Sequence, residues 1–235
     1  TYKLDIFEAR NFSLEYNDTL TTERISGCEE LYYNWWKLDD NGERIETQGN
    51  FGRNVENVTE SSNKLYIIDF NTAQKALGEY FVAVHIGKQN HKPQTVDFFI
   101  TIQKRSFTSS DLTDLDAATR TVEQGARVNI QLNLTDTSAG RSGDPLEEAS
   151  VYIMIGGRRI NLTESGTQPG IYQGTIPTAQ YQTFFQGQTV TCKLYVTKEN
   201  YETQQVTFNV NVKMMSIAGI PIFYLVLGIS IPLAI

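Results

Sequence analysis

A strict alternation of apolar and polar residues runs through the second half of the chain. In ARVNIQLNLTDT (126–137) every second residue from Val128 to Leu134 is apolar, and the residues between them are Asn or Gln. ASVYIMIGG (149–157) and QVTFNVNVK (205–213) repeat the pattern. Successive side chains of a strand point to opposite faces, so this pattern predicts strands with one buried and one solvated face. Antiparallel sandwiches are built from strands of this kind.

Short strands also account for the first half of the chain. The segments KLYIIDF (64–70), GEYFVAVHI (78–86) and TVDFFITIQ (95–103) are rich in β-branched and aromatic residues, which favour strands. Asn41-Gly42 stands between two strand-like arms, and this dipeptide is a strong signal for a tight hairpin turn. No stretch before residue 214 has a helical period. We therefore predict an all-β fold.

A polar stretch divides the chain into two parts. SFTSSDLTDLD (106–116) has the composition of a linker. We therefore predict one β-sandwich over residues 1–105, a linker over 106–118 and a second β-sandwich over 119–213. Each sandwich would have about 100 residues, which is a usual domain size.

The chain ends in an apolar segment. The 22 residues Met214–Ile235 contain no Asp, Glu, Lys, Arg or His. As a helix they would be about 33 Å long, enough to cross a hydrocarbon core of about 30 Å. Pro221 and Pro232 are tolerated in membrane helices. We predict a single transmembrane helix over 214–235, with a pair of buried strands as the alternative. Only Lys213 separates it from the last strand, so the second sandwich would stand directly on the membrane.

The first domain carries two motifs that resemble an immunoglobulin-like sandwich. YNWWK (33–37), followed by DDNG (39–42), resembles strand C, where a tryptophan fills the core ahead of a charged turn. GEYFVAV (78–84) resembles strand F with its tyrosine corner. Val82 stands where antibody domains have their second cysteine. The resemblance therefore implies the fold without its disulfide, and it leaves Cys28 unpaired within this domain.

The second domain carries resemblances of its own. GDPLEEASVYIMIGG (143–157) and PGIYQGTIPT (169–178) are similar to the immunoglobulin-like repeats of prokaryotic surface proteins and invasin-type adhesins. The passage from a strand into GIPIFYLVLGISIP (219–232) is similar to membrane-anchored archaeal surface proteins. Together these resemblances imply tandem immunoglobulin-like domains held at a cell membrane. They are resemblances of fold, so the function has to be argued from a site.

The ionisable residues offer little chemistry. The formal net charge is −7, from 27 acidic and 20 basic residues, whereas a nucleic-acid partner would require a concentrated basic face. His85 and His91 are too few for a metal cage. The sequence has no nucleophile motif, P-loop or dinucleotide fingerprint. We therefore expect no enzyme activity, no catalytic residue, no cofactor and no bound metal.

Two features leave alternatives open. Cys192 lies on the apolar face of its strand, which predicts a core position, and it could be free or bonded to Cys28. Asp111, Asp114 and Asp116 lie in the predicted linker. They could bind calcium, which prefers hard oxygen ligands, or they could only keep the linker solvated.

The sequence predicts two kinds of surface site. Five asparagines fit the Asn-x-Ser/Thr pattern of N-glycosylation acceptors. These are Asn11, Asn17, Asn57, Asn133 and Asn161. If Tyr33 and Trp35 face the core, then Tyr32, Trp36 and Leu38 face outward. We predict that these three form a contact patch, unless another part of the same domain covers them.

These observations favour a non-enzymatic, membrane-anchored structural or adhesive protein of the cell surface, such as a subunit or anchor of a surface layer or extracellular assembly. Residues 1–213 would lie outside the cell, N-terminus included, and 214–235 would lie in the membrane. Further copies or other surface proteins would be its partners. The alternative is the ectodomain of a receptor, or an accessory binding subunit of a membrane complex. That protein would show a concave ligand site or a polar intramembrane face.

Overall fold

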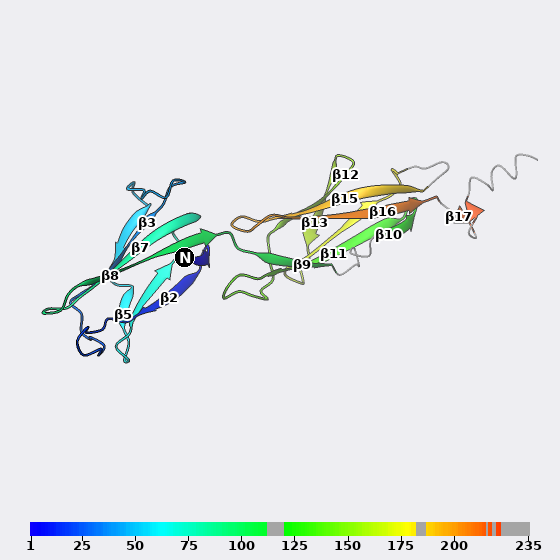
Figure 1. Ribbon diagram of the computed structural model, residues 1–235. Helices are drawn as coiled ribbons and strands as arrows, with labels where there is room; N and C mark the ends of the chain where they lie inside the picture. Colours follow the sequence, from blue (N-terminus) through cyan, green and yellow to red (C-terminus); the bar gives the residue numbers. More distant parts are fainter. Residues whose placement is uncertain (112–119, 182–186, 215, 218–219, 222–235) are drawn as a thin grey trace, which may run out of the picture. The chain divides into compact units, whose positions relative to one another are not determined.

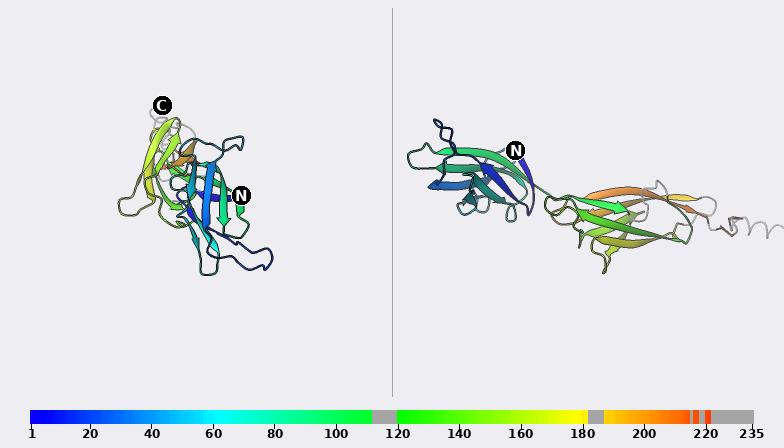
Figure 2. Two further views of the ribbon diagram at one scale, coloured as in Figure 1. Left: turned by 90° about the vertical axis from the view of Figure 1, so that its left-hand side faces the viewer. Right: turned by 90° about the horizontal axis from the view of Figure 1, so that it is seen from below.

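The computed structural model describes residues 1–111, 120–181, 187–214, 216–217 and 220–221. Every regular element in these ranges is a β-strand, as the sequence predicts. The chain divides into two compact units, Thr1–Arg105 and Ser106–Ile235, here called domain one and domain two. In each unit the strands form two layers (Figures 1 and 2).

Domain one consists of two sheets. The larger sheet has the strand order β1 (Tyr2–Asp5), β8 (Gln94–Gln103), β7 (Gly78–Gly87), β3 (Glu30–Lys37) and β4 (Phe51–Asn54). The smaller sheet has the order β2 (Ala9–Leu14), β6 (Tyr66–Asn71) and β5 (Val58–Glu60). β1 runs parallel to β8, and all other neighbours are antiparallel. This is the strand order of an immunoglobulin-like sandwich.

The core of domain one lies between these two sheets. It includes Tyr33, Ile68, Val82 and Ile100, each of which is at most 1% exposed. The hydroxyl of Tyr33 donates a hydrogen bond to the carbonyl of Asp69 at 3.1 Å. The polar end of this buried ring is therefore satisfied, as a core position requires.

Two core-facing aromatic residues, Tyr80 and Trp35, belong to the two motifs that resemble strands F and C of an immunoglobulin-like sandwich. Tyr80 forms the expected tyrosine corner, because its hydroxyl donates to the carbonyl of Ala76 at 2.8 Å. Burial raises the pKa of Tyr80 to about 12. Trp35 packs against the core but is only half-buried, and the Lys75 ammonium lies 4.6 Å from its ring centre. The core position predicted for Trp35 is therefore a position at the margin of the core.

Domain two also has two layers. The described strands of one layer are β9 (Phe107–Asp111), β11 (Arg127–Asp136) and β14 (Ile171–Pro177). Those of the other are β10 (Arg120–Glu123), β16 (Gln204–Lys213), β15 (Gln188–Thr197), β12 (Ser150–Ile155) and β13 (Arg158–Glu164). β13 joins the two layers, because its first part pairs with β12 and its last two residues pair with β14.

The core of domain two follows the alternation of the sequence. Along β11 the residues Val128, Ile130, Leu132 and Leu134 are at most 2% exposed. Cys192 on β15 is fully buried, which confirms its predicted core position, and both cysteines of the chain are free.

The predicted linker over 106–118 is wrong in its first part. Residues 107–111 form β9, which pairs antiparallel with β11 at the edge of domain two. Phe107 is 3% exposed, and its ring centre lies 6.2 Å from that of Tyr201. Phe107 is the only large apolar residue of this strand, so no alternation marks it. Residues 112–119, which include Asp114 and Asp116, lie outside the described residues.

The predicted transmembrane helix over 214–235 falls largely outside the described residues. Where the segment is described, Ser216–Ile217 (β17) and Ile220–Pro221 (β18) pair as two short antiparallel strands. The described parts of the chain contain no helix with the length and apolar character needed to cross a membrane.

Candidate functional site

An aromatic row crosses the outer face of the larger sheet in domain one. Trp36 on β3 stands opposite Phe51 on β4 and opposite Phe81 on β7, and Phe81 stands opposite Phe99 on β8. Their neighbours along the strands, such as Tyr80 and Ile100, belong to the core, so these four rings point away from it. We call Phe51, Trp36, Phe81 and Phe99 the aromatic row.

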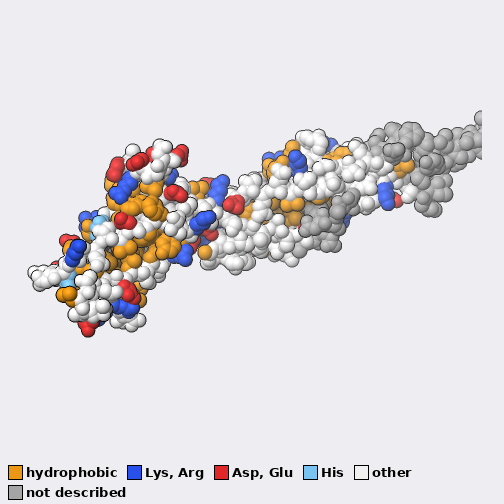
Figure 3. All heavy atoms as spheres, in the orientation of Figure 1, with side chains coloured by type: hydrophobic (Ala, Val, Ile, Leu, Met, Phe, Trp, Pro, Cys, Tyr) orange, Lys and Arg blue, Asp and Glu red, His pale blue; other side chains and the backbone are white. Residues whose placement is uncertain are grey.

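The two ends of the aromatic row are exposed to solvent. Phe51 is 45% exposed and Phe99 is 44% exposed, whereas Phe81 is 9% exposed and Trp36 is half-buried. The ring centres of Trp36 and Phe81 are 5.9 Å apart, and those of Phe81 and Phe99 are 5.4 Å apart with an edge-on geometry. Figure 3 shows hydrophobic side chains gathered over the region of β3, β7 and β8, with charged side chains around them. An apolar patch with a polar rim is typical of an interaction surface.

Two arginines lie against these aromatic rings. The guanidinium carbon of Arg44 is 4.1 Å from the ring centre of Phe81 and 4.6 Å from that of Trp36. Arg53 lies over Tyr32 at 3.6 Å. These are cation–π distances. Both arginines are exposed, and the rings beneath them are half-buried or, for Phe81, buried.

A second row runs beside the aromatic row and carries opposite charges at its ends. Arg53 on β4 stands opposite Asn34 on β3, Asn34 stands opposite Ala83 on β7, and Ala83 stands opposite Asp97 on β8. Arg53 and Asp97 are both exposed. Beyond this row, Tyr32 stacks on His85 with ring centres 4.8 Å apart. The outer face of β4, β3, β7 and β8, here called the contact face, is therefore apolar along one row and charged at both ends of the next.

The structure places two of the three predicted patch residues on the contact face. Tyr32 and Trp36 lie there, both half-buried. Leu38 is not accessible to a partner, because it is 8% exposed and packs with Phe81 and Ala83. Its side of the strand was predicted correctly. The hairpin that follows it folds back, with Leu38 bridged to Arg44, and covers it.

Sequence reasoning missed the other members of the aromatic row. The alternation of TVDFFITIQ (95–103) was a usable signal for Phe99, because Ile100 and Ile102 face the core and odd positions must then face outward. Phe81 carries the same signal in its strand. Phe51 carries none, because the polar and glycine residues around it show no alternation.

A groove of about 400 Å³ adjoins the contact face. Its lining includes Glu29, Glu30, Tyr32, Arg53 and Val55. Arg53 already occupies the aromatic surface of Tyr32 from within the same chain. This groove therefore extends the contact face, and Glu29 and Glu30 place two carboxylates at its rim.

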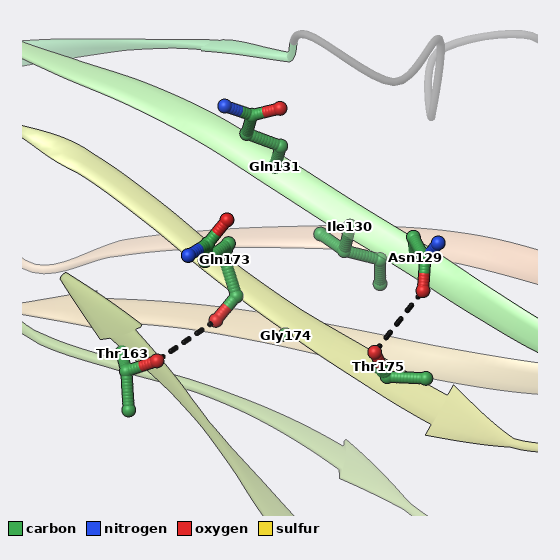
Figure 4. A pocket seen from close by; sticks show the side chains of 7 residues that line it. All are labelled: Asn129, Ile130, Gln131, Thr163, Gln173, Gly174 and Thr175. Atoms are coloured by element: carbon green, nitrogen blue, oxygen red, sulfur yellow. Dashed lines mark hydrogen bonds between the residues drawn. The ribbon is translucent and has the colours of Figure 1, made fainter. Parts of the chain in front are cut away.

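Domain two has a second groove, of about 500 Å³, on the outer side of β11 and β14 (Figure 4). Amide and hydroxyl side chains surround it, and Thr175 donates to the Asn129 side chain at 3.1 Å. Thr163 donates to the backbone carbonyl of Gln173 at 3.4 Å. None of the lining residues is ionisable, so the groove can form hydrogen bonds but offers no acid, base or nucleophile.

The described residues contain no group of three or more His, Cys, Asp or Glu side chains placed to hold a metal ion. His85 shares a hydrogen bond of 3.1 Å with Thr95, and His91 lies 3.8 Å from a carboxylate oxygen of Asp18. Asp111 ends β9 opposite Leu132. Calcium binding by the acids of the predicted linker stays a prediction.

The predicted glycosylation acceptors lie on strands and loops of both domains. Asn133 on β11 is half-buried, and the other four are exposed. The exposed acceptors are Asn11, Asn17, Asn57 and Asn161. Exposure is what a glycan requires, and modification of all five sites stays a prediction.

Comparisons with known proteins give similarity at the level of architecture alone. No family model and no curated protein matches the sequence. Among solved structures, the chain is similar to a tandem pair of titin Ig domains, with 10% identity and a TM-score of 0.32, over 90% of this chain and 92% of that one. It is also similar to the N-terminal Ig1-2 module of the Drosophila receptor protein tyrosine phosphatase DLAR, with 12% identity and a TM-score of 0.29, over 91% and 94%. Domains 4 and 5 of the S-layer protein SbsC give 12% identity and a TM-score of 0.32, over 80% and 100%. Values this low support no conclusion about function.

Proposed function

We propose that this chain is a non-enzymatic structural or adhesive protein of the cell surface, anchored in the membrane through residues 214–235, with domain one as its contact module. The aromatic row is the observation that carries this proposal. Folding of the sandwich does not require Phe51 and Phe99 to stand in solvent, since the core lies on the other side of the sheet. Aromatic side chains of this kind are the residues that dominate binding energy at protein interfaces.

The chemistry of the rest of the described surface is consistent with a binding or structural role. The groove of domain two is lined by neutral groups, and the ionisable residues nearest the contact face serve as a rim. Sugars attached to the exposed acceptor asparagines would suit an extracellular location. The uncharged segment 214–235 supplies the length for a membrane anchor.

A protease-protection experiment tests this proposal. Intact cells producing the full chain are treated with protease and then fractionated. We expect domains one and two to be digested from outside while a short fragment containing residues 214–235 stays with the membrane. Recovery of both domains undigested from intact cells, together with digestion after lysis, would contradict an extracellular location. Recovery of the intact chain outside the membrane fraction would contradict the anchor.

The alternative function is a receptor ectodomain or an accessory binding subunit. The groove of domain two is the observation that favours it, because its amides and hydroxyls could bind a neutral, hydroxyl-rich ligand. Titration of the full chain with neutral oligosaccharides, followed by NMR of the Asn and Gln side-chain amides, distinguishes the two functions. Saturable shifts confined to Asn129, Gln131 and Gln173 would support the alternative, and their absence would favour the structural role.

A further inference from the structure

We infer that the contact face binds the same face of a second copy of this chain, across a two-fold axis that lies between the two packed sheets, parallel to their plane and nearly parallel to the strands, above the line between β3 and β7. This inference rests on the proposed contact function of domain one and names the partner. The strand order β4–β3–β7–β8 makes such an axis possible, because it exchanges β4 with β8 and β3 with β7 while keeping each row in place.

The residues of the aromatic row match one another under this exchange. Phe51 of one copy would face Phe99 of the other, and Trp36 would face Phe81, because these pairs stand at equal distances from the axis. The two most exposed rings of the row thus cover each other, and at the centre the Arg44 side chains lie between the two less exposed rings of each copy. A two-fold interface requires self-complementarity of this kind.

The charged row matches under the same exchange. Arg53 would face Asp97 of the second copy, and Asn34 would face Ala83. The ion pair would occur twice, once at each edge of the interface. The other in-plane axis, perpendicular to the strands, would set Phe51 against Phe51 and would leave Arg53 without an acid opposite it. Charge complementarity therefore selects the axis between β3 and β7.

Arg44 has a place in the same arrangement. It lies over Trp36 and Phe81 and is bridged to Leu38, which lies beside Glu79. The axis brings Leu38 of one copy opposite Glu79 of the other. Because Arg44 lies over Trp36 and Phe81, which flank the axis, the two Arg44 side chains would meet there, with an exposed Glu79 carboxylate of the opposite copy in the next row to offset their charge.

The expected size of the interface makes the association weak. Three strands of eight residues and the four residues of β4, at about 4.8 Å between strands and about 3.4 Å per residue, give a face of about 450 Å². Two such faces cover about 900 Å², just under the limit of about 1,000 Å² for a specific, stable interface. Pairing would therefore be favoured where copies are concentrated on one surface, as the proposed function requires.

Cross-linking of two single-cysteine variants tests the axis. Phe51→Cys and Phe99→Cys are made in the full chain with Cys28 replaced by Ala, and Cys192 is buried. Packed sheets lie about 10 Å apart, so a bis-maleimide of about that reach is used. We expect covalent dimers when the two variants are mixed and few when either is alone. Efficient cross-linking of Phe51→Cys alone, or none in the mixture, would overturn the inference.

Charge reversal tests the pairing independently. Arg53→Glu and Asp97→Arg should each weaken dimerisation of the full chain in one detergent by about tenfold, since the contact occurs twice. The double variant should restore it to within about threefold of the unmodified chain. Arg127→Glu in domain two is the matched control for net charge, and it should leave dimerisation unchanged. Failure of the double variant to recover would overturn the inference. Protease protection on cells does not depend on dimerisation, so the proposed function could survive that result.

Discussion

The edge strand of the contact face depends on one missing methyl group. Gly52 on β4 stands opposite Trp35 on β3. A Cβ atom at this position would lie 2.7 Å from Trp35 Nε1, 2.9 Å from Cε2 and 3.0 Å from Cζ2. Favourable contacts between heavy atoms occur at about 3.5–4.0 Å, so either the indole or β4 would have to move in Gly52→Ala.

The surroundings of the indole set the size of the effect. The ring centres of Tyr80 and Trp35 are 5.8 Å apart, and the Lys75 ammonium lies 4.6 Å from the centre of the indole ring. The indole therefore has little room to move away from β4. Inserting atoms into packed structure usually costs about 1–3 kcal/mol. Gly52 does not have a positive φ, so without the clash alanine would instead stabilise the strand by about 0.5–1 kcal/mol. A decrease in the free energy of unfolding of Gly52→Ala would therefore indicate the clash with Trp35, and an increase would indicate that there is none.

Equilibrium unfolding of the full chain in urea measures this sign. Both tryptophans of the chain lie in domain one, so their fluorescence reports that domain. We expect Gly52→Ala to lower the free energy of unfolding by about 1–3 kcal/mol. In a Trp35→Leu background the same substitution should be neutral or stabilising, because the clashing atoms are gone. A Gly52→Ala variant as stable as the unmodified chain would refute the predicted clash.

Three further results are expected. Trp36→Ala should weaken self-association by at least about tenfold and lower the unfolding free energy by only about 1–2 kcal/mol, measured by sedimentation and by urea unfolding, because its ring is half-buried and packs on Phe81. Burial raises the pKa of both thiols, that of Cys192 to about 11, and only Cys192 is fully buried, so at pH 8 iodoacetamide should label the half-buried Cys28 first, as mass spectrometry would show. Burial acts to raise the pKa of Glu164, but hydrogen bonds from two backbone N–H groups and a tyrosine hydroxyl lower it below its ordinary 4.5. Its stabilisation is present above the ordinary value and is lost as pH falls through the folded-state pKa, so acid unfolding of Glu164→Gln should depend less on pH in that range.

The alternation of the sequence predicted the parts of the fold that depend on one strand at a time. The buried face of β11 and the core position of Cys192 follow from the period of two, because side-chain direction is a local property of the strand. Strand β9 was missed because it pairs with the end of β11, where Phe107 stands opposite Asp136, 29 residues away in the chain. That pairing leaves no mark within the strand itself.

The contact face was only partly predictable for a related reason. Trp36 could be placed on the outer side of its strand, but its neighbours across the sheet depend on register, and the alternation does not specify which residues of two strands stand opposite. Leu38 shows the second limit. Its direction was right, and a hairpin formed by later residues determined whether it was exposed.

The outer face of β11 differs from that of β7 and β8 in a way that folding does not explain. Each sandwich buries one face of its strands, and the other face is free to vary as long as it tolerates water. On β11 that outer face carries Asn129, Gln131 and Asn133, which water solvates at no cost to the core. On β7 and β8 of domain one it carries Phe81 and Phe99. Phe99 is 44% exposed, and an exposed aromatic ring favours association and works against solubility, so a surface that is covered when the protein functions would account for it.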